Sequence, residues 1–545
     1  MILLRIVLSI NFLFIAIYGS AQDATFERSD SLMGNHSAER KWWDVTHYDL
    51  HARFDPENKT ISGKNKASYK VLTPYQTMQI DLQAPMVLDS VIQNNQHCKW
   101  TQEDDAYFVQ LPNKQIVGEM NEVTFYFHGR PKVAKMPPWQ GGVIWQKDNN
   151  NNPWMSIACQ GMAASVWFPN KDHMYDEVDS VSMHITAPEK LVTVAGGRLR
   201  SIMTNADATK TYHWAVVNPI NNYNIIPYIG KYINIQDTFQ GEGGVLDINY
   251  WVLDYNKEKA AEHFKQTKSM LRCFESWFGK YPFYEDGYKL VESPHLGMEH
   301  QSAIAYGNRF NQGYMGRDLS GTGWGLKWDF IIVHESGHEW FGNNISARDV
   351  ADNWIHEGFT AYSENLYTEY LFGKTAGAEY VVGTRKAVIN DKPIIGPYGV
   401  NKNGSGDMYY KAANMLHTIR QIVNDDVKWK AFLRNINKTF WHKTTDTREV
   451  ENYMSNYLGI NLQKVFDQYL RTTEIPVLEY VQDNKKLKYR WSNSIDGFDM
   501  PVEVISQGQK IKIKPSEKWQ TLKLKTADKI EIDKNYYVIQ NLQSK

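Results

Sequence analysis

The sequence has little cysteine, little net charge and few long apolar runs. Only three of its 545 residues are cysteines, Cys98, Cys159 and Cys273, so at most one disulfide can form and the fold does not depend on a disulfide framework. The formal net charge is −1 at pH 7, which leaves no basic field to attract nucleic acid or anionic lipid. We therefore expect no nucleic-acid partner.

Long apolar runs are confined to the first residues. Arg5 precedes an apolar stretch over residues 6–18, and small residues follow over 19–21. This pattern predicts a secretory signal peptide over residues 1–21, cleaved before Gln22, because the stretch is short for a membrane span; an uncleaved anchor is the alternative. We expect no membrane span in the mature chain and a periplasmic or secreted location.

The remaining chain has the length and composition of a multidomain globular protein. It is too long for one core, and 42% of its residues are hydrophobic and 13% aromatic. Short alternating segments recur over residues 41–254, helical spacing dominates over 255–473, and alternation returns over 474–545 after the break at Pro476. The prediction is a multidomain α+β fold with an N-terminal β domain, a mostly helical catalytic domain and a small C-terminal β-sandwich domain.

One segment of the helical region carries a strong chemical signal. His334 and His338 are four residues apart, so on a helix they lie on one face and can hold one metal ion. Glu335 lies beside them and is free to act as a base. Because such a pattern also occurs on solvated helix faces, a third ligand is needed, and Glu357 is the candidate after an interval of 18 residues (339–356).

Two imidazoles and one carboxylate suit a catalytic zinc ion, which leaves its fourth position to water. Zinc lowers the pKa of such a water from 15.7 to about 7 and makes it a nucleophile at neutral pH. Glu335 would then take the water proton and deliver it to the leaving amine. We predict one Zn²⁺ per chain, bound by His334, His338 and Glu357.

These motifs resemble those of the aminopeptidase N and leukotriene hydrolase family of gluzincin zinc metallopeptidases. Residues 334–338 match the HExxH motif, residues 340–343 continue the match, and Glu357 stands at the family's spacing in a segment similar to W-L-N-E-G-F-A. The resemblance implies a saddle-shaped N-terminal β domain and a thermolysin-like catalytic domain. It also implies a bacterial, secreted member without the large C-terminal helical domain of many relatives, because the sequence stops at Lys545, and hence an open cleft.

The resemblance also implies a residue that stabilises the oxyanion. Residues 409–413, YYKAA, resemble the family motif Y-x-K-G-A. Tyr409 would donate its phenol to the oxyanion, with the adjacent Tyr410 as a competitor. An alanine, Ala412, stands in place of the usual glycine.

Further positions implied by the resemblance concern substrate binding. Residues 296–301, LGMEHQ, resemble the exopeptidase motif G-x-M-E-N. Glu299 would pair with the α-ammonium group of the substrate, and Met298 would form the floor of the first side-chain pocket. Gln160 precedes a Phe-Pro pair at the interval seen in the family, so it would reach into the cleft and help to bind the ammonium.

Two residues near the predicted ligands have open roles. His356 stands where the family usually has asparagine. Glu364 follows Glu357 by seven residues and so lies on the same helical face, where it could accept a hydrogen bond from a ligand histidine or remain a surface carboxylate.

The leading hypothesis is a zinc metallo-aminopeptidase that acts as a monomer on peptides with a free amino terminus. A thermolysin-like endopeptidase is one alternative, which would use the same zinc ligands but would not need Glu299. An epoxide hydrolase of the leukotriene type is another, and it would depend on a lipid tunnel. A catalytically inactive binding protein would be expected to have lost a ligand or the base, and all four residues are present.

Overall fold

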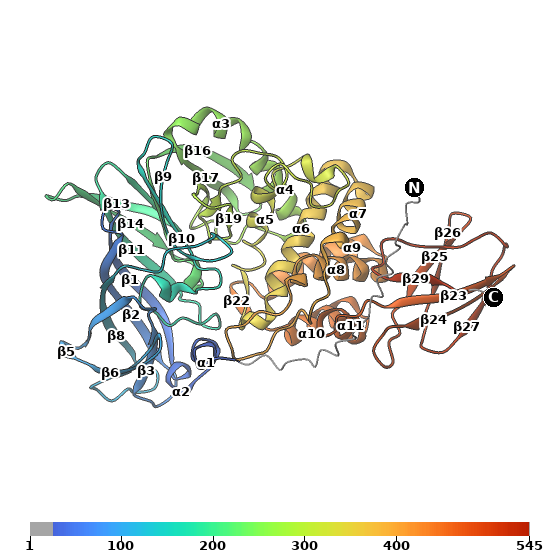
Figure 1. Cartoon of the computed structure of the whole chain (residues 1–545), viewed down its shortest axis with the longest axis horizontal. Helices are drawn as coiled ribbons and strands as arrows, with labels where there is room; N and C mark the ends of the chain where they lie inside the picture. Colours follow the sequence, from blue (N-terminus) through green and yellow to red (C-terminus); the bar gives the residue numbers. More distant parts are fainter. Residues whose placement is uncertain (1–25, 544–545) are drawn as a thin grey trace, which may run out of the picture.

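The structure is a computed structural model that describes residues 26–543, so the predicted leader over residues 1–21 lies outside the described residues. Figure 1 shows β-sheets at one end of the molecule, helices in the middle and a second group of strands at the other end. The predicted fold class is therefore confirmed. Within residues 26–543, no helix is both long and apolar enough to cross a membrane.

The N-terminal domain is built on an eight-stranded sheet with the order β13-β14-β11-β1-β2-β8-β4-β5. Its central strand β1 buries nearly every second side chain, because successive side chains of a strand point to opposite faces. The buried face shares one hydrophobic cluster with two smaller sheets, β12-β15-β10-β9 and β3-β7-β6. The other face is polar.

The strands of the eight-stranded sheet are β1 (Trp43–Asp55), β2 (Thr60–Val71), β4 (Met86–Gln93), β5 (Gln96–His97), β8 (Met120–Gly129), β11 (Ser180–Pro188), β13 (Arg198–Thr204) and β14 (Thr209–Val216). Those of the two smaller sheets are β3 (Thr77–Asp81), β6 (Lys99–Glu103), β7 (Ala106–Gln110), β9 (Gly142–Lys147), β10 (Pro153–Ala158), β12 (Val192–Ala195) and β15 (Pro227–Gly230). Two short helices, α1 (Arg28–Gly34) and α2 (Ala38–Lys41), precede them.

The catalytic domain combines helices with a five-stranded sheet of order β16-β17-β18-β20-β19. The sheet consists of β16 (Tyr232–Gly241), β17 (Gly244–Leu253), β18 (Tyr288–Glu292), β19 (Gly297–Met298) and β20 (Ile304–Tyr306). The helices are α3 (Lys257–His263), α4 (Gln266–Phe278), α5 (Phe330–Gly337), α6 (Trp354–Phe372), α7 (Lys374–Gly383), α8 (Tyr410–Val423), α9 (Asp426–Thr439), α10 (Thr447–Leu458) and α11 (Gln463–Arg471), with a two-stranded sheet of β21 (Ile345–Ala347) and β22 (Lys443–Thr445).

This sheet differs from the expected division of the chain at residue 255. β17 pairs in parallel with β18, from Ile248 opposite Tyr288 to Trp251 opposite Val291. Ile248 and other buried residues of β16 and β17 belong to the hydrophobic cluster of the catalytic helices. Hydrogen bonding and packing therefore place residues 232–253 with the catalytic domain, although their alternation looks like that of the preceding strands.

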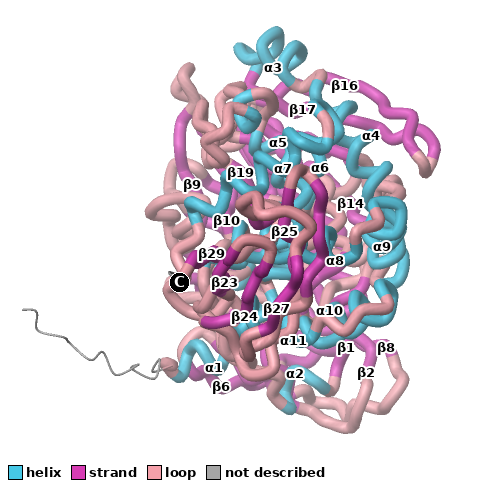
Figure 2. The backbone as a smooth tube through the Cα atoms, turned by 90° about the vertical axis from the view of Figure 1, so that its right-hand side faces the viewer, coloured by secondary structure: helices cyan, strands magenta, loops and turns pink. Residues whose placement is uncertain are grey.

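The C-terminal strands form two small sheets, β27-β24-β23-β29 and β26-β25-β28. Their bounds are β23 (Val477–Asp483), β24 (Lys486–Ser492), β25 (Val502–Ser506), β26 (Gln509–Ile513), β27 (Gln520–Lys523), β28 (Glu531–Ile532) and β29 (Ile539–Leu542). Figure 2 shows these strands in front of the helices, on the side away from the N-terminal domain. Their buried side chains, such as Trp491, continue the hydrophobic cluster of the catalytic domain.

Candidate active site

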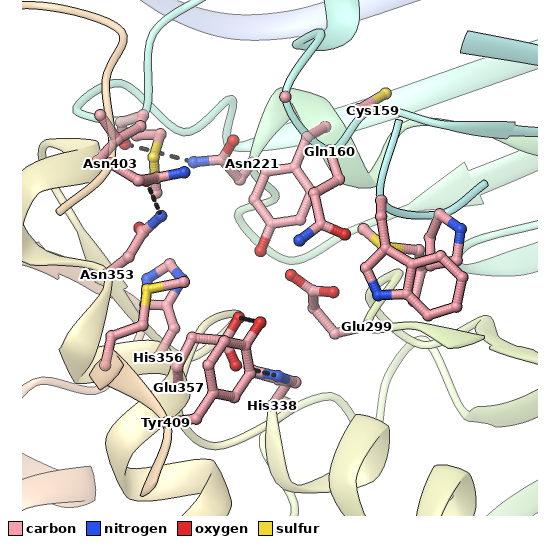
Figure 3. A pocket seen from close by; sticks show the side chains of 18 of the residues that line it. Cys159, Gln160, Asn221, Glu299, His338, Asn353, His356, Glu357, Asn403 and Tyr409 are labelled. Atoms are coloured by element: carbon pink, nitrogen blue, oxygen red, sulfur yellow. Dashed lines mark hydrogen bonds and ion pairs between the residues drawn. The ribbon is translucent and has the colours of Figure 1, made fainter. Parts of the chain in front are cut away.

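A cavity of about 650 Å³ lies between the N-terminal domain and the catalytic helices. Gln160 and Tyr223 line it from the N-terminal domain, and Glu299, His338 and Tyr409 line it from the catalytic domain. In Figure 3 the side chains of Gln160 and Glu299 point toward each other across this space. The cavity is large enough for several residues of a peptide and combines apolar walls with polar and charged side chains, which suits a site for a polar ligand.

Helix α5 places three functional side chains at the bottom of the cavity. Asp329 begins the helix as its N-cap, because its carboxylate accepts hydrogen bonds from the backbone N–H groups of Ile331 and Ile332. The apolar residues that follow are buried and fix the helix in the core. His334 and Glu335 lie one turn before the end of the helix, and His338 is its C-cap residue.

The structure brings His334, His338 and Glu357 together. Glu357 Oε2, on α6, lies 3.6 Å from His334 Nε2 and 3.4 Å from His338 Nε2. This buried oxygen has no hydrogen-bond partner among the described residues. Two nitrogens and an unsatisfied carboxylate oxygen within 4.8 Å of one another fit the donor set of zinc.

Hydrogen bonds hold both imidazoles in the orientation that such a site needs. His334 Nδ1 donates to Glu364 Oε1 at 2.8 Å, and His338 Nδ1 donates to the carbonyl oxygen of Phe341 at 2.9 Å. Each Nε2 is then the unprotonated atom and faces Glu357. Glu364 is fully buried and also accepts a bond from Tyr380, so it is not a surface carboxylate.

His356 lies beside the cavity but is used by the backbone. Its Nε2 accepts a hydrogen bond of 2.7 Å from the backbone N–H of Ala347, in β21. Burial lowers the pKa of His356 to about 3, so the imidazole is neutral. The nitrogen that could bind a metal is therefore occupied, and His356 instead fixes β21 against α6.

Glu335 has a different environment from the carboxylate of Glu357. Burial raises the pKa of Glu335 to about 7, the value that suits a group exchanging protons at neutral pH. Sequence reasoning missed Gly297, whose backbone touches this carboxylate: a Cβ atom at residue 297 would lie 2.5 Å from Glu335 Oε1. The glycine of the LGMEHQ segment was the available signal.

Glu299 faces the same space as Glu335. Carboxylate oxygens of Glu299 and Glu335 and a ring nitrogen of His338 lie within 4.8 Å of one another. Within the described residues, the ion pairs of this site join imidazoles to Glu357 and Glu364, and none joins Glu299 to a lysine or arginine. The carboxylate of Glu299 is therefore available for a cation from outside the chain.

The loop that carries Glu299 is anchored to the end of α5. Glu339 is fully buried and accepts hydrogen bonds from the backbone N–H of Ser302 and from Asn343 Nδ2. Asn343 Nδ2 also donates to the carbonyl oxygen of Glu299 at 2.8 Å. Burial raises the pKa of Glu339 to about 7. This network ties the position of Glu299 to that of the predicted ligands, and sequence reasoning left it out.

Tyr409 and Met298 complete the set of predicted residues in the cavity. The Tyr409 hydroxyl donates to Glu357 Oε1 at 2.8 Å, as the dashed line in Figure 3 marks. Burial and the neighbouring Glu357 keep the pKa of Tyr409 well above its usual value, so the phenol stays a donor. Met298 is 6% exposed and lines the wall, and Tyr410 lines the cavity without a hydrogen bond to the predicted ligands among residues 26–543.

Comparison with known proteins agrees with this arrangement. Residues 262–469 match the peptidase family M1 domain. The chain is 20% identical over 226 residues to "Probable aminopeptidase 1" of Sulfurisphaera tokodaii, covering 39% of this chain and 28% of that protein. It is 25% identical over 134 residues to endoplasmic reticulum aminopeptidase 1 of Mus musculus, covering 23% and 14%. The chain thus spans less than a third of the length of either relative.

The solved M1 zinc metallopeptidase of Deinococcus radiodurans has the same fold, with a TM-score of 0.68 and 21% identity. That comparison covers 82% of this chain and 97% of the other. The likeness therefore extends across both the N-terminal β domain and the catalytic domain. The M1 domain over residues 262–469, the curated aminopeptidase relatives and the structural likeness together support an aminopeptidase N-type gluzincin family.

Proposed function

We propose that the protein is a zinc-dependent aminopeptidase that removes amino-terminal residues from peptides, with Glu335 as the general base. One observation carries the proposal: the carboxylate of Glu299, which forms no ion pair with a lysine or arginine of the described residues, lies in the same cavity as Glu335 and His338, within 4.8 Å of both. An endopeptidase needs no such negative charge beside its base. The names of the curated relatives, which are aminopeptidases, support the same activity.

His334, His338 and Glu357 would hold one zinc ion, which when bound acts as a Lewis acid and acidifies water. Glu299 binds the α-ammonium group of the substrate, and the amide of Gln160 assists from the opposite wall. Glu335 takes the proton of the attacking water and then gives it to the leaving amine. Tyr409 donates its hydroxyl to the oxygen that becomes negative in the tetrahedral state.

A substrate panel tests the exopeptidase activity directly. Aminoacyl fluorogenic substrates should be cleaved, and the same compounds with an acetylated amino group should not, because a charge-assisted bond to Glu299 contributes about 1.5–3 kcal/mol, or roughly 10- to 200-fold. In Glu299→Ala the activity on free amino termini should fall by that factor, while activity on acetylated substrates should change little. An unchanged ratio of the two activities would contradict the role of Glu299.

The two alternative activities predict turnover of different substrates. An endopeptidase would cleave internal bonds of peptides blocked at both ends, and a leukotriene-type epoxide hydrolase would open a lipid epoxide. A variant of the Deinococcus radiodurans protein has been solved with a Tyr-Ser-Ala substrate, so a tripeptide is a suitable first substrate for this chain as well.

Elemental analysis should find one zinc at this site, and Glu357→Ala should lose it.

Export and a monomeric state are further parts of the proposal. The apolar stretch over residues 6–18 followed by small residues supports cleavage before Gln22. Amino-terminal sequencing of the mature protein from the periplasm or the medium would test the cleavage, and light scattering would test the monomer.

A further inference from the structure

A row of histidines crosses three adjacent strands on the polar face of the eight-stranded sheet. His51 on β1 stands opposite His184 on β11, and His184 stands opposite His213 on β14. Because the three residues share one register, their rings stack, with centroids 4.2 Å apart in both pairs. None of them belongs to the cavity described above. The three strands lie at the left edge of Figure 1, away from α5 and α6.

Asp49 completes this cluster from the same face of β1. One of its oxygens, Oδ1, lies 3.1 Å from His51 Nε2 and 3.4 Å from His184 Nε2. Charge-assisted hydrogen bonds are usually shorter, about 2.7–2.9 Å. Two ligand atoms of a tetrahedral site with metal bonds of about 2.0–2.1 Å are roughly 3.3 Å apart, which is the spacing observed here.

Two polar atoms of this cluster have no protein partner. Asp49 Oδ1, which faces the Nε2 atoms of His51 and His184, has no hydrogen-bond partner among the described residues, and neither has the buried Nε2 of His213. The cluster thus presents an unsatisfied carboxylate oxygen beside two imidazoles.

The cluster is open to solvent on one side and has cationic neighbours on the other. The side chains of His51, Asp49 and His184 are 39%, 28% and 25% exposed, so an ion and its water ligands can enter. On β2, Lys64 stands opposite His51 and Lys66 stands opposite Asp49. Arg200, on β13, exerts an electrostatic effect on His213. Lys66 is paired with Glu122 at 3.3 Å, which reduces its repulsion of a cation.

We propose that Asp49, His51 and His184 bind a divalent transition-metal ion of the zinc, cobalt or nickel class, separate from the catalytic site. Neutral imidazoles with one carboxylate select these ions over calcium or magnesium, which prefer all-oxygen sites. The ion would join β1 to β11, which are distant in sequence and adjacent in the sheet. Its role is therefore structural, and the proposal does not depend on the peptidase activity.

Counting bound metal in variants of the full chain tests this site. After loading with Zn²⁺ and dialysis, wild type should contain one equivalent more than His184→Ala, and Asp49→Asn should bind the extra ion at least about 10-fold more weakly. Titration of the protein with Ni²⁺ in the presence of a chromophoric chelator, which competes for the ion, gives the affinity of this site for the metal. Hydrolysis of an aminoacyl substrate should be the same in all these proteins, because the sheet face is remote from the cavity.

His128→Ala is a matched control, because His128 pairs with Asp89 at 2.6 Å on β8 and β4 of the same sheet but has no second imidazole. It should keep the extra equivalent. Circular dichroism and the unfolding temperature of metal-free His184→Ala, with His184→Gln as a second variant, show whether the sheet is intact. Equal metal content in wild type and a folded His184 variant, or the same loss in His128→Ala, would overturn the proposal.

Discussion

At the scale of single residues, the site gives two glutamates opposite properties. Burial opposes the ionisation of Glu357, but the adjacent imidazoles of His338 and His334 hold its pKa below the usual range. Glu335 is also buried, and there burial prevails, so its pKa rises to about 7. One carboxylate thus remains ionised, as its predicted role as a ligand requires, while the other can accept and release a proton. The two roles follow from position and not from residue type.

Gly297 is the residue whose importance is easiest to test. A methyl group at this position would lie 2.5 Å from Glu335 Oε1 and would push the base out of place. We expect Gly297→Ala to lower kcat by about 10-fold or more, toward the loss of at least about 10²-fold expected for Glu335→Gln. Zinc content should be unchanged in both variants. The measurement is steady-state kinetics on an aminoacyl substrate together with metal analysis.

The matched control is Gly406→Ala, because a Cβ atom at residue 406 meets nothing within 4 Å. It should retain wild-type kcat. If Gly297→Ala behaves like this control, the close contact with Glu335 has no effect on the position of the base.

Tyr409 and Tyr410 are adjacent, yet only one reaches the predicted ligands. Because the Tyr409 hydroxyl lies 2.8 Å from Glu357 Oε1, Tyr409→Phe should lower kcat by roughly 10²-fold with little change in KM. Tyr410→Phe removes a hydroxyl of the same kind from the same cavity wall and should leave kcat within about twofold of wild type. The reverse result would assign the oxyanion donor to Tyr410.

At the scale of elements, helix α6 carries both a predicted ligand, Glu357, and a residue that supports the site, Glu364. Glu357 and Glu364 are seven residues apart and therefore lie on one face, two turns from each other. Glu364 reaches across to His334 on α5, which the close approach of the two helices permits: a Cβ atom at Gly337 would lie 2.7 Å from Ser363 Oγ. The position of the first ligand thus depends on the packing of α5 on α6.

Loss of Glu364 should weaken the metal site without removing a ligand. In Glu364→Ala, His334 loses the acceptor that fixes its tautomer, and zinc affinity should fall by about 10- to 100-fold. Glu364→Gln keeps an acceptor oxygen and should recover much of this loss. Tyr380→Phe, which removes only the bond to Glu364 Oε2, should have a smaller effect. Competition with a chromophoric zinc chelator measures all three, and equal affinities would show that Glu364 does not support the site.

The sequence predicted the parts of this site that depend on local spacing. The interval of four residues between His334 and His338 requires only a helix, and the place of Glu357 requires only that a second helix return to the first. The close approach of Gly297 to Glu335 depends on how β19 packs on α5, which no local pattern encodes. The same holds for His356, whose bond to Ala347 links segments that are near only in the folded chain.

At the scale of the whole molecule, the cavity depends on how the N-terminal domain sits on the catalytic domain. Asn224 Nδ2 donates to Asn343 Oδ1 at 2.8 Å, and Gly197 N–H donates to Ser302 Oγ at 2.9 Å. Asn343 and Ser302 both belong to the Glu339 network that anchors the loop of Glu299. The N-terminal domain thus lines the cavity through Gln160 and also braces the loop that holds Glu299.

The extent of the catalytic domain leads to a prediction about fragments. The alternation of polar and apolar residues predicts that residues 232–253 form strands. It does not predict which sheet these strands join, because strand pairing depends on partners distant in sequence. β17 covers one edge of β18, and Phe239, Leu246 and Ile248 are buried in the catalytic core. A fragment of residues 231–543 should therefore be soluble and unfold cooperatively, whereas one of residues 255–543 should aggregate, since it exposes an unpaired buried strand and loses several kcal/mol of apolar burial.

Both fragments lack the N-terminal domain to the same degree, so the contact face lost with that domain cancels in the comparison. Soluble yield and thermal unfolding measure the difference, and equal behaviour of the two fragments would mean that β16 and β17 contribute little to the stability of the catalytic domain.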